Sequence, residues 1–311
     1  MSPLLEIRVP ISPTADFFHR IHFLAASLRQ IGGVLADHEF VVCVGGDEKP
    51  VDLYEELPWS KHYPITWRWV DRERFRVESY WETSREIFRQ RARGKFVMCA
   101  DADVVFVRDF SDLIDRLEHP PAVAGVIAHA PPFPKLPPSE IWDKLCGDYG
   151  VCVPPSIHEH TGWGFMVKTP QHRYTPVYFN FGMVVAPAAL MDKVGEEIIA
   201  ADHFVSERVT TFFRFQIALT LAMQKQRLAS LALPLRYNFP NDPRFDRAYP
   251  DELTNVRVLH YLRCEIVHRE NDFADLERVA AIIRRRDLVG SNEVLRKRLE
   301  ELYPMVAAEE S

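Results

Sequence analysis

Short apolar runs alternate with helical patterns through the first half of this chain. Residues 39–44 and 96–100 are almost entirely apolar, which is typical of strands that are buried on both faces of a parallel sheet. Residues 14–31 carry apolar side chains at helical spacing, and Gly32 and Gly33 follow them as a stop. This rhythm of strand and helix predicts an α/β domain with a mostly parallel sheet flanked by helices.

The same patterns predict the remaining elements. Further strands are expected at residues 6–11, 65–69, 122–128, 177–185, 228–233 and 256–262, and further helices at 78–93, 111–118, 187–201 and 206–226. After Arg263 the sequence is helical and basic. We therefore expect one domain over residues 1–263 and a helical C-terminal extension over residues 264–311.

Charge and cysteine usage limit the classes of partner and compartment. Thirty-eight Lys and Arg against 44 Asp and Glu give a net charge of −6, which argues against broad nucleic-acid binding. No apolar run approaches the ~20 residues of a transmembrane helix, and the N-terminus lacks the pattern of a signal peptide. Five irregularly spaced cysteines indicate free thiols, so we expect a cytoplasmic protein. The basic extension allows a weak peripheral contact with a membrane, although a solvated helix face is the simpler interpretation.

Residues 129–177 interrupt the rhythm with many prolines. This density predicts neither a regular helix nor a central strand. A long irregular segment in a compact domain is usually functional, so we expect it to cover the carboxyl end of the sheet and shape an acceptor site. The aromatic residues at 161–165, Trp163 among them, either stack on a sugar ring or pack against hydrophobic side chains of their own loop.

Two carboxylates, Asp101 and Asp103, follow the apolar run at 96–100. If the strand continues this far, both side chains point to the same side, because side chains alternate along a strand. Ligands of open α/β sheets bind at this carboxyl edge. Two like charges held together favour a cation between them, and a divalent ion on two carboxylates keeps positions open for phosphate oxygens. The motif therefore predicts a clamp for a metal ion and a diphosphate.

A phosphohydrolase is the alternative. Residues 96–105 resemble the motif of the haloacid-dehalogenase-like phosphohydrolases, in which Asp101 would be the nucleophile. That family places the motif on its first strand, whereas about a hundred residues precede it here. The paired acidic segment that the family carries downstream is not found either.

An ordered set of segments resembles a known family. Residues 96–113, with the Asp-x-Asp motif, resemble the GT-A nucleotide-sugar glycosyltransferases, and most closely family 8, which includes glycogenin and bacterial lipopolysaccharide galactosyltransferases. Residues 178–185 (Tyr-Phe-Asn-Phe-Gly-Met-Val-Val), 233–238 (Leu-Pro-Leu-Arg-Tyr-Asn) and His260-Tyr261 resemble later motifs of that family in the right order. The resemblance covers residues 1 to about 263 and implies a GT-A-like (Rossmann-like) fold.

The resemblance also implies roles for individual residues. Asp101, Asp103 and His260 would bind a metal ion, and two oxygens with one imidazole suit Mn²⁺ somewhat better than Mg²⁺. Asn180 and Gln216 would be the catalytic residues at the donor sugar. The implied substrate contacts are Arg85, Asp101, Ala102, Asp103, Asn180, Gly182, Gln216 and Arg263.

Two positions depart from the family pattern. Phe215 stands where the family has an acidic residue, and Leu262-Arg263-Cys264 lacks the lysine that contacts the diphosphate, so Arg263 is expected to replace it. The expected reaction is metal-dependent transfer of a sugar from a nucleotide-diphosphate sugar, a UDP-hexose, to an unidentified carbohydrate or glycolipid acceptor, with retention of configuration. The departures leave a non-catalytic sugar-nucleotide-binding protein as a further alternative.

Overall fold

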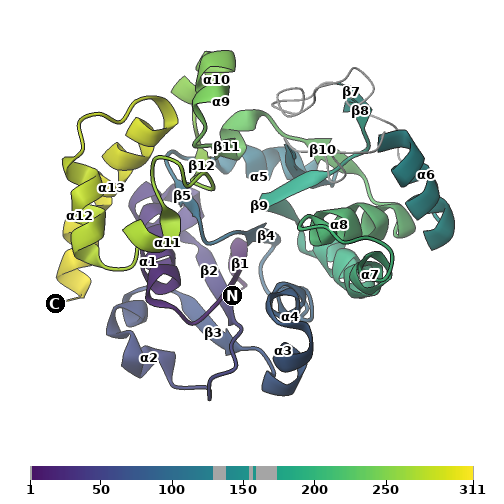
Figure 1. The fold of residues 1–311 in the computed structure, drawn as a ribbon, viewed down its shortest axis with the longest axis horizontal. Helices are drawn as coiled ribbons and strands as arrows, with labels where there is room; N and C mark the ends of the chain where they lie inside the picture. The colour runs from purple at the N-terminus through teal and green to yellow at the C-terminus, as the bar shows by residue number, and fades with distance from the viewer. Residues whose placement is uncertain (1, 129–137, 154–156, 159–173, 311) are drawn as a thin grey trace.

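A seven-stranded sheet forms the centre of the computed structural model, which describes residues 2–128, 138–153, 157–158 and 174–310 (Figure 1). The strands lie in the order β10-β6-β9-β4-β1-β2-β3. Their bounds are β1 Leu5–Ile11, β2 His38–Val44, β3 Ile65–Trp69, β4 Phe96–Ala100, β6 Val123–Ile127, β9 Phe179–Pro187 and β10 Ser230–Ala232. Only β9 runs antiparallel to its neighbours in this sheet, which confirms the expected mostly parallel arrangement.

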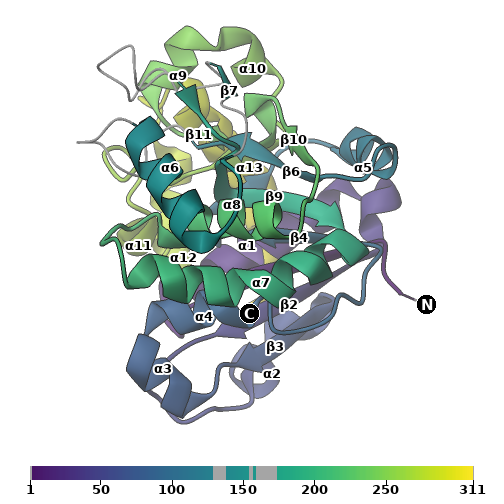
Figure 2. The ribbon, with the colours of Figure 1, turned by 90° about the vertical axis from the view of Figure 1, so that its right-hand side faces the viewer.

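Helices cover both faces of the sheet, because alternate side chains of the buried strands point to opposite sides. In β2, Phe40 and Val42 belong to one apolar core, which α1 (Ala15–Ile31) covers, whereas Val41 and Cys43 belong to the other. Helices α7 (Ala188–Ser206) and α8 (Arg214–Lys225) cover this second core (Figures 1 and 2). The apolar runs of the sequence are therefore buried on both sides, as predicted.

The C-terminal extension packs on the domain. Helix α13 (Gly290–Glu309) lies beside α1, and α12 (Leu276–Arg284) packs against α13 (Figure 1). Leu295 and Leu302 of α13 share the core of β1. The boundary at residue 263 stays a prediction. The other helices are α2 Leu53–Glu56, α3 Arg72–Glu78, α4 Tyr80–Glu86, α5 Ser111–Glu118, α6 Pro138–Tyr149, α9 Pro243–Ala248, α10 Pro250–Thr254 and α11 Arg269–Asp272. None of the helices in the described ranges is both long and apolar enough to cross a bilayer.

Three expectations about elements are wrong. The helix expected at 78–93 is only the short helix α4, over residues 80–86, and the preceding helix α3 ends at Glu78. The backbone amides of Arg93 and Gly94, at the end of the expected range, bind the buried carboxylate of Glu6. Helix α8 begins at Arg214 rather than at residue 206. Helix α6 lies within the proline-rich segment, and its first residue is Pro138, where a proline is tolerated because that N–H has no partner inside the helix. Trp163 lies outside the described residues.

Candidate active site

Asp101 and Asp103 lie in a turn between two sheets. Strand β4 ends at Ala100, and after Asp103 the chain enters β5 (Val104–Phe106), which leaves the central sheet. β5 joins β11 (Phe239–Pro240) and β12 (Val258–His260) in a three-stranded sheet. The central strand therefore does not continue through the two carboxylates, and the carbonyl of Asp103 accepts a hydrogen bond from the Tyr261 amide (2.9 Å) beside this second sheet.

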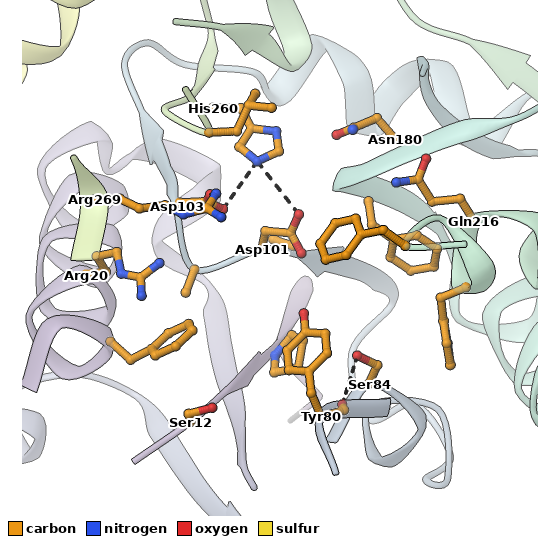
Figure 3. A pocket seen from close by; sticks show the side chains of 18 of the residues that line it. Ser12, Arg20, Tyr80, Ser84, Asp101, Asp103, Asn180, Gln216, His260 and Arg269 are labelled. Atoms are coloured by element: carbon orange, nitrogen blue, oxygen red, sulfur yellow. Dashed lines mark hydrogen bonds and ion pairs between the residues drawn. The ribbon is translucent and has the colours of Figure 1, made fainter. Parts of the chain in front are cut away.

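The second sheet brings His260 to the carboxylates. β12 pairs antiparallel with β5, and His260 lies opposite Val104 in the register. Its Nε2 atom lies 3.2 Å from Asp103 Oδ1 and 3.7 Å from Asp101 Oδ2 (Figure 3). The structure therefore gathers the three residues that the sequence proposed as metal ligands, although His260 lies far along the chain.

These three side chains fit a small divalent ion. One ligand atom from each lies within 4.8 Å of the other two, and no second cluster of this kind occurs in the described part of the chain. Adjacent ligands of an octahedral ion bound at ~2.1 Å lie ~3 Å apart, close to the distances between His260 and the two carboxylates. The donor set of two oxygens and one imidazole suits Mn²⁺ or Mg²⁺.

The two carboxylates differ in their electrostatic surroundings. Burial and the neighbouring Asp103 raise the pKa of Asp101 to about 6. Burial also acts against the ionised form of Asp103, but His260 and Arg269 outweigh it and lower the pKa of this carboxyl below its usual range. Without a further cation, the site thus holds one firmly ionised carboxylate beside a second that resists ionisation, which is the expected result for two like charges close together.

A chain of amides orients His260. Its Nδ1 atom lies 3.0 Å from Asn238 Oδ1, and Asn238 Nδ2 donates to Asn180 Oδ1 at 2.8 Å. Because Asn238 Oδ1 can only accept, Nδ1 carries the proton and leaves Nε2 as the metal-binding nitrogen. Asn238 ends the motif at residues 233–238, but the sequence alone assigned no role to it.

Gly182 makes room for this arrangement. A Cβ atom at this position would lie 2.2 Å from His260 Nδ1 and 2.6 Å from Asn238 Oδ1. The sequence predicted a wall of the sugar pocket here, but Gly182 is not among the residues that line the cavity described below. Its backbone N–H donates to Asn180 Oδ1 at 2.9 Å, so this strand position supports both Asn180 and His260.

Replacing Gly182 with alanine should therefore displace His260. We expect Gly182→Ala to weaken Mn²⁺ binding by ~10–100-fold, the usual effect of disturbing the groups that orient a ligand. Isothermal titration with Mn²⁺ measures this. Gly147→Ala, at an exposed helical site with nothing within 4 Å of its Cβ, is the matched control and should bind Mn²⁺ as the wild type does. Equal Mn²⁺ affinities for the two variants would contradict this role of Gly182.

A cavity of about 870 Å³ opens above the three proposed ligands. Asn180 and Gln216 lie on one side of the carboxylates, and Arg20 and Arg269 lie on the other (Figure 3). Gln216 Oε1 is buried and has no hydrogen-bond partner among the described residues. A polar atom that is buried without a partner in the cavity wall is a ready contact for a polar ligand.

The proposed substrate contacts divide into two groups. Ala102, Asn180, Gln216 and Arg263 line the cavity together with the two carboxylates. Gly182 and Arg85 do not line it. Arg85 is 1% exposed and forms an ion pair with Asp202 at 2.6 Å. A donor contact through Arg85 has no support in this geometry, because the buried carboxylate already holds the guanidinium.

The cavity also contains residues that the sequence did not indicate. Arg20 comes from the interior of α1 and Arg269 from α11, and Arg269 forms an ion pair with Asp103. Tyr80, Trp81, Phe212 and Phe213 add an aromatic part of the wall. No local pattern marks these side chains, since each belongs to a segment that reads as an ordinary amphipathic helix or loop.

No protein-family model matches this chain, and no curated protein matches it either. Among solved structures, the galactosyltransferase LgtC in complex with donor and acceptor sugar analogs aligns with 96% of this chain and 95% of its own, at 14% identity and a TM-score of 0.52. The chain has the fold of LgtC. The GT-A fold that the motifs imply is thereby confirmed.

Other solved structures also match. An active-site variant of LgtC with glutamate in place of glutamine aligns with 89% of this chain and 95% of its own, also at 14% identity and a TM-score of 0.52. The bifunctional glycosyltransferase WbbM aligns with 85% of this chain at 12% identity and a TM-score of 0.48, and this chain spans 46% of the length of WbbM.

Proposed function

We propose that this chain is a metal-dependent glycosyltransferase, which moves a sugar from a nucleotide-diphosphate sugar to an acceptor. The observation that carries the proposal is the convergence of Asp101, Asp103 and His260 beside an 870 Å³ cavity. The fold supports it, because LgtC, with the same fold, was crystallised with donor and acceptor sugar analogs. We further propose a UDP-hexose as the donor and retention of configuration, as the sequence motifs imply.

The charge of the departing diphosphate is the chemical problem that this site would solve. A divalent ion held by Asp101, Asp103 and His260 would act as a Lewis acid toward the diphosphate oxygens. Arg20, Arg263 and Arg269 line the same cavity and add positive charge from the chain itself. Guanidinium groups suit this task because their planar donors match phosphate oxygens.

Asn180 and Gln216 are proposed to bind the donor sugar. Asn180 Oδ1 already accepts hydrogen bonds from Gly182 and Asn238, so its amide Nδ2 remains to donate to a sugar oxygen. Gln216 presents Oε1, which has no hydrogen-bond partner in the described ranges of the chain and can accept a bond from a sugar hydroxyl. A glutamine in the active site of LgtC supports this assignment, since its replacement by glutamate defines one of the solved variants.

The aromatic part of the wall is proposed to receive a carbohydrate or glycolipid acceptor. Phe212 is 77% exposed although it lines the cavity, and Trp81 and Phe213 lie in the same wall. Aromatic faces pack well against sugar rings and hydrocarbon.

A thermal-shift experiment tests the proposed function. We expect UDP and UDP-hexoses to raise the melting temperature only when Mn²⁺ or Mg²⁺ is present. A ligand that binds only the native state stabilises it by about 2.7 kcal/mol at one hundred times its Kd. GDP- and ADP-linked sugars in the same experiment show whether the protein distinguishes the nucleobase of the donor. An unchanged melting temperature with every nucleotide would contradict the proposal.

The same samples separate the alternatives. Release of UDP from a UDP-hexose supports a transferase, whereas binding without turnover would support a non-catalytic sugar-nucleotide-binding protein. The phosphohydrolase is not favoured, because the fold aligns with LgtC and β4 is not the first strand of the chain. An aspartyl phosphate trapped on Asp101 would reverse that judgement.

A further inference from the structure

We propose that Arg269 is an exchangeable cation of this site: it neutralises Asp103 when no metal ion is bound and binds the diphosphate of the donor when the ion occupies Asp103. This inference rests on the proposed function. It assigns the diphosphate contact, which the missing lysine leaves open, to a residue of the C-terminal extension.

Both oxygens of Asp103 are engaged in this structure. Oδ1 lies 3.2 Å from His260 Nε2, and Oδ2 accepts a hydrogen bond from Arg269 Nη1. A divalent ion between Asp101, Asp103 and His260 would come close to this guanidinium. The two cations would repel each other and compete for the same carboxylate. Metal binding therefore favours the departure of Arg269 from Asp103.

The other two arginines in the cavity have carboxylate partners outside the metal site. Arg20 Nη2 forms an ion pair with Asp16 at 2.5 Å, and its guanidinium lies 3.8 Å above the ring of Phe17. Arg263 Nε lies 3.3 Å from Asp242. Among the described residues, Asp103 is the one carboxylate that forms an ion pair with Arg269. Within the part of the chain that the structure describes, Arg269 is thus the cavity arginine whose one carboxylate partner is also a proposed ligand of the metal ion.

The position of Arg269 suits a diphosphate. Its side chain is 29% exposed, lines the cavity and lies beside the carboxylates on the side away from Asn180 and Gln216 (Figure 3). A donor whose diphosphate contacts the metal ion and whose sugar lies at Asn180 and Gln216 would place phosphate oxygens within reach of this guanidinium. Charge-assisted, bidentate bonds to these oxygens would replace the lost bond to Asp103.

This exchange predicts two effects of opposite sign for one substitution. Arg269→Ala removes the competitor for Asp103, so Mn²⁺ alone should bind roughly fivefold more tightly, as expected for the loss of a partly exposed ion pair. The same variant loses a diphosphate contact, so UDP at saturating Mn²⁺ should bind about tenfold more weakly or worse. Titration calorimetry with Mn²⁺ alone, and then with UDP in saturating Mn²⁺, measures both affinities.

Three further variants complete the test. Arg269→Gln should reproduce both effects with a side chain of similar length, and it replaces the alanine variant if that one does not fold. Arg269→Lys keeps the charge but loses the bidentate geometry, so its UDP affinity should lie between those of the wild type and Arg269→Ala. Arg284→Ala removes an exposed arginine from the end of α12 and should leave both affinities unchanged.

The outcomes distinguish the inference from the proposed function. If Arg269→Ala and Arg269→Gln weaken Mn²⁺ and UDP binding together, or change neither, the exchange is wrong while the glycosyltransferase proposal stands. If wild-type protein binds no UDP in the presence of Mn²⁺ or Mg²⁺, the proposed function and this inference both fail.

Discussion

Asp103→Asn is expected to abolish Mn²⁺-dependent UDP binding while the protein keeps its fold. The substitution removes the negative charge from the carboxylate that lies nearest to His260, at 3.2 Å, and a neutral amide oxygen attracts a divalent cation less strongly than a carboxylate does. Disturbing groups that merely orient a ligand costs ~10–100-fold in metal affinity, so losing the ligand itself should cost at least ~100-fold. Calorimetry with Mn²⁺ and then with UDP measures the loss, and the far-UV spectrum and melting temperature report on the fold.

The control for this variant is Asp115→Asn. Asp115 is an exposed carboxylate on α5, and its replacement by asparagine removes the same charge at a position away from the cavity. It should bind Mn²⁺ and UDP as the wild type does. If Asp103→Asn also keeps wild-type affinity for both, Asp101, Asp103 and His260 do not form a metal site, and the proposed function loses its main support.

Asp202→Ala is expected to cause the largest loss of stability. Asp202 is fully buried and accepts hydrogen bonds from two arginines, Arg85 Nε at 2.8 Å and Arg214 Nε at 2.6 Å. Removing one partner of a buried ion pair leaves the other charge uncompensated and costs about 3–5 kcal/mol. The free energy of unfolding, measured with urea, should fall by this amount.

The location of this network links stability to the cavity. Arg85 lies on α4, Asp202 on α7 and Arg214 on α8, two residues before Gln216. The carboxylate thus ties together three helices, one of which carries a proposed sugar contact. Glu293→Ala is the control, because Glu293 forms an exposed ion pair with Lys297 on α13, and such pairs contribute little. Arg85 Nη1 also lies 3.4 Å from a carboxylate oxygen of Glu78 and 3.4 Å from one of Glu82. A similar free energy of unfolding for both variants would contradict the prediction and would mean that these two carboxylates compensate Arg85 without Asp202.

Much of the fold was predictable because buried strands and helices have apolar patterns that can be recognised in short stretches of sequence. The strands at 39–44 and 96–100 could be recognised since nearly every side chain in them is apolar, and both are buried in the central sheet. Helix α1 could be recognised from its periodic apolar positions. The sequence did not predict α6, because its segment contains many prolines. The helix nevertheless forms, since it contains a single proline, at its first residue, where a proline is tolerated.

The candidate site was predictable to a different extent at each residue. Asp101 and Asp103 follow a strand that could be recognised, so local sequence was enough to propose them. His260 was proposed only through the resemblance to a family motif, and β12 delivers it in a second sheet rather than in the central one. Arg85 was assigned to the donor by the same resemblance, but Asp202, far away in sequence, holds it in a buried network.

Local sequence thus specified most of the strands and helices, the position of Asp101 and Asp103 directly after a buried strand, and the class of fold, because hydrophobic periodicity depends on residues that are close together in the chain. Only the tertiary structure decided that β5 pairs with β12, that Gly182 leaves space for His260, and that Arg269 meets Asp103. These contacts join residues that are far apart in sequence. Their partners are chosen by how the sheets and helices pack, and no local pattern in the chain records that choice.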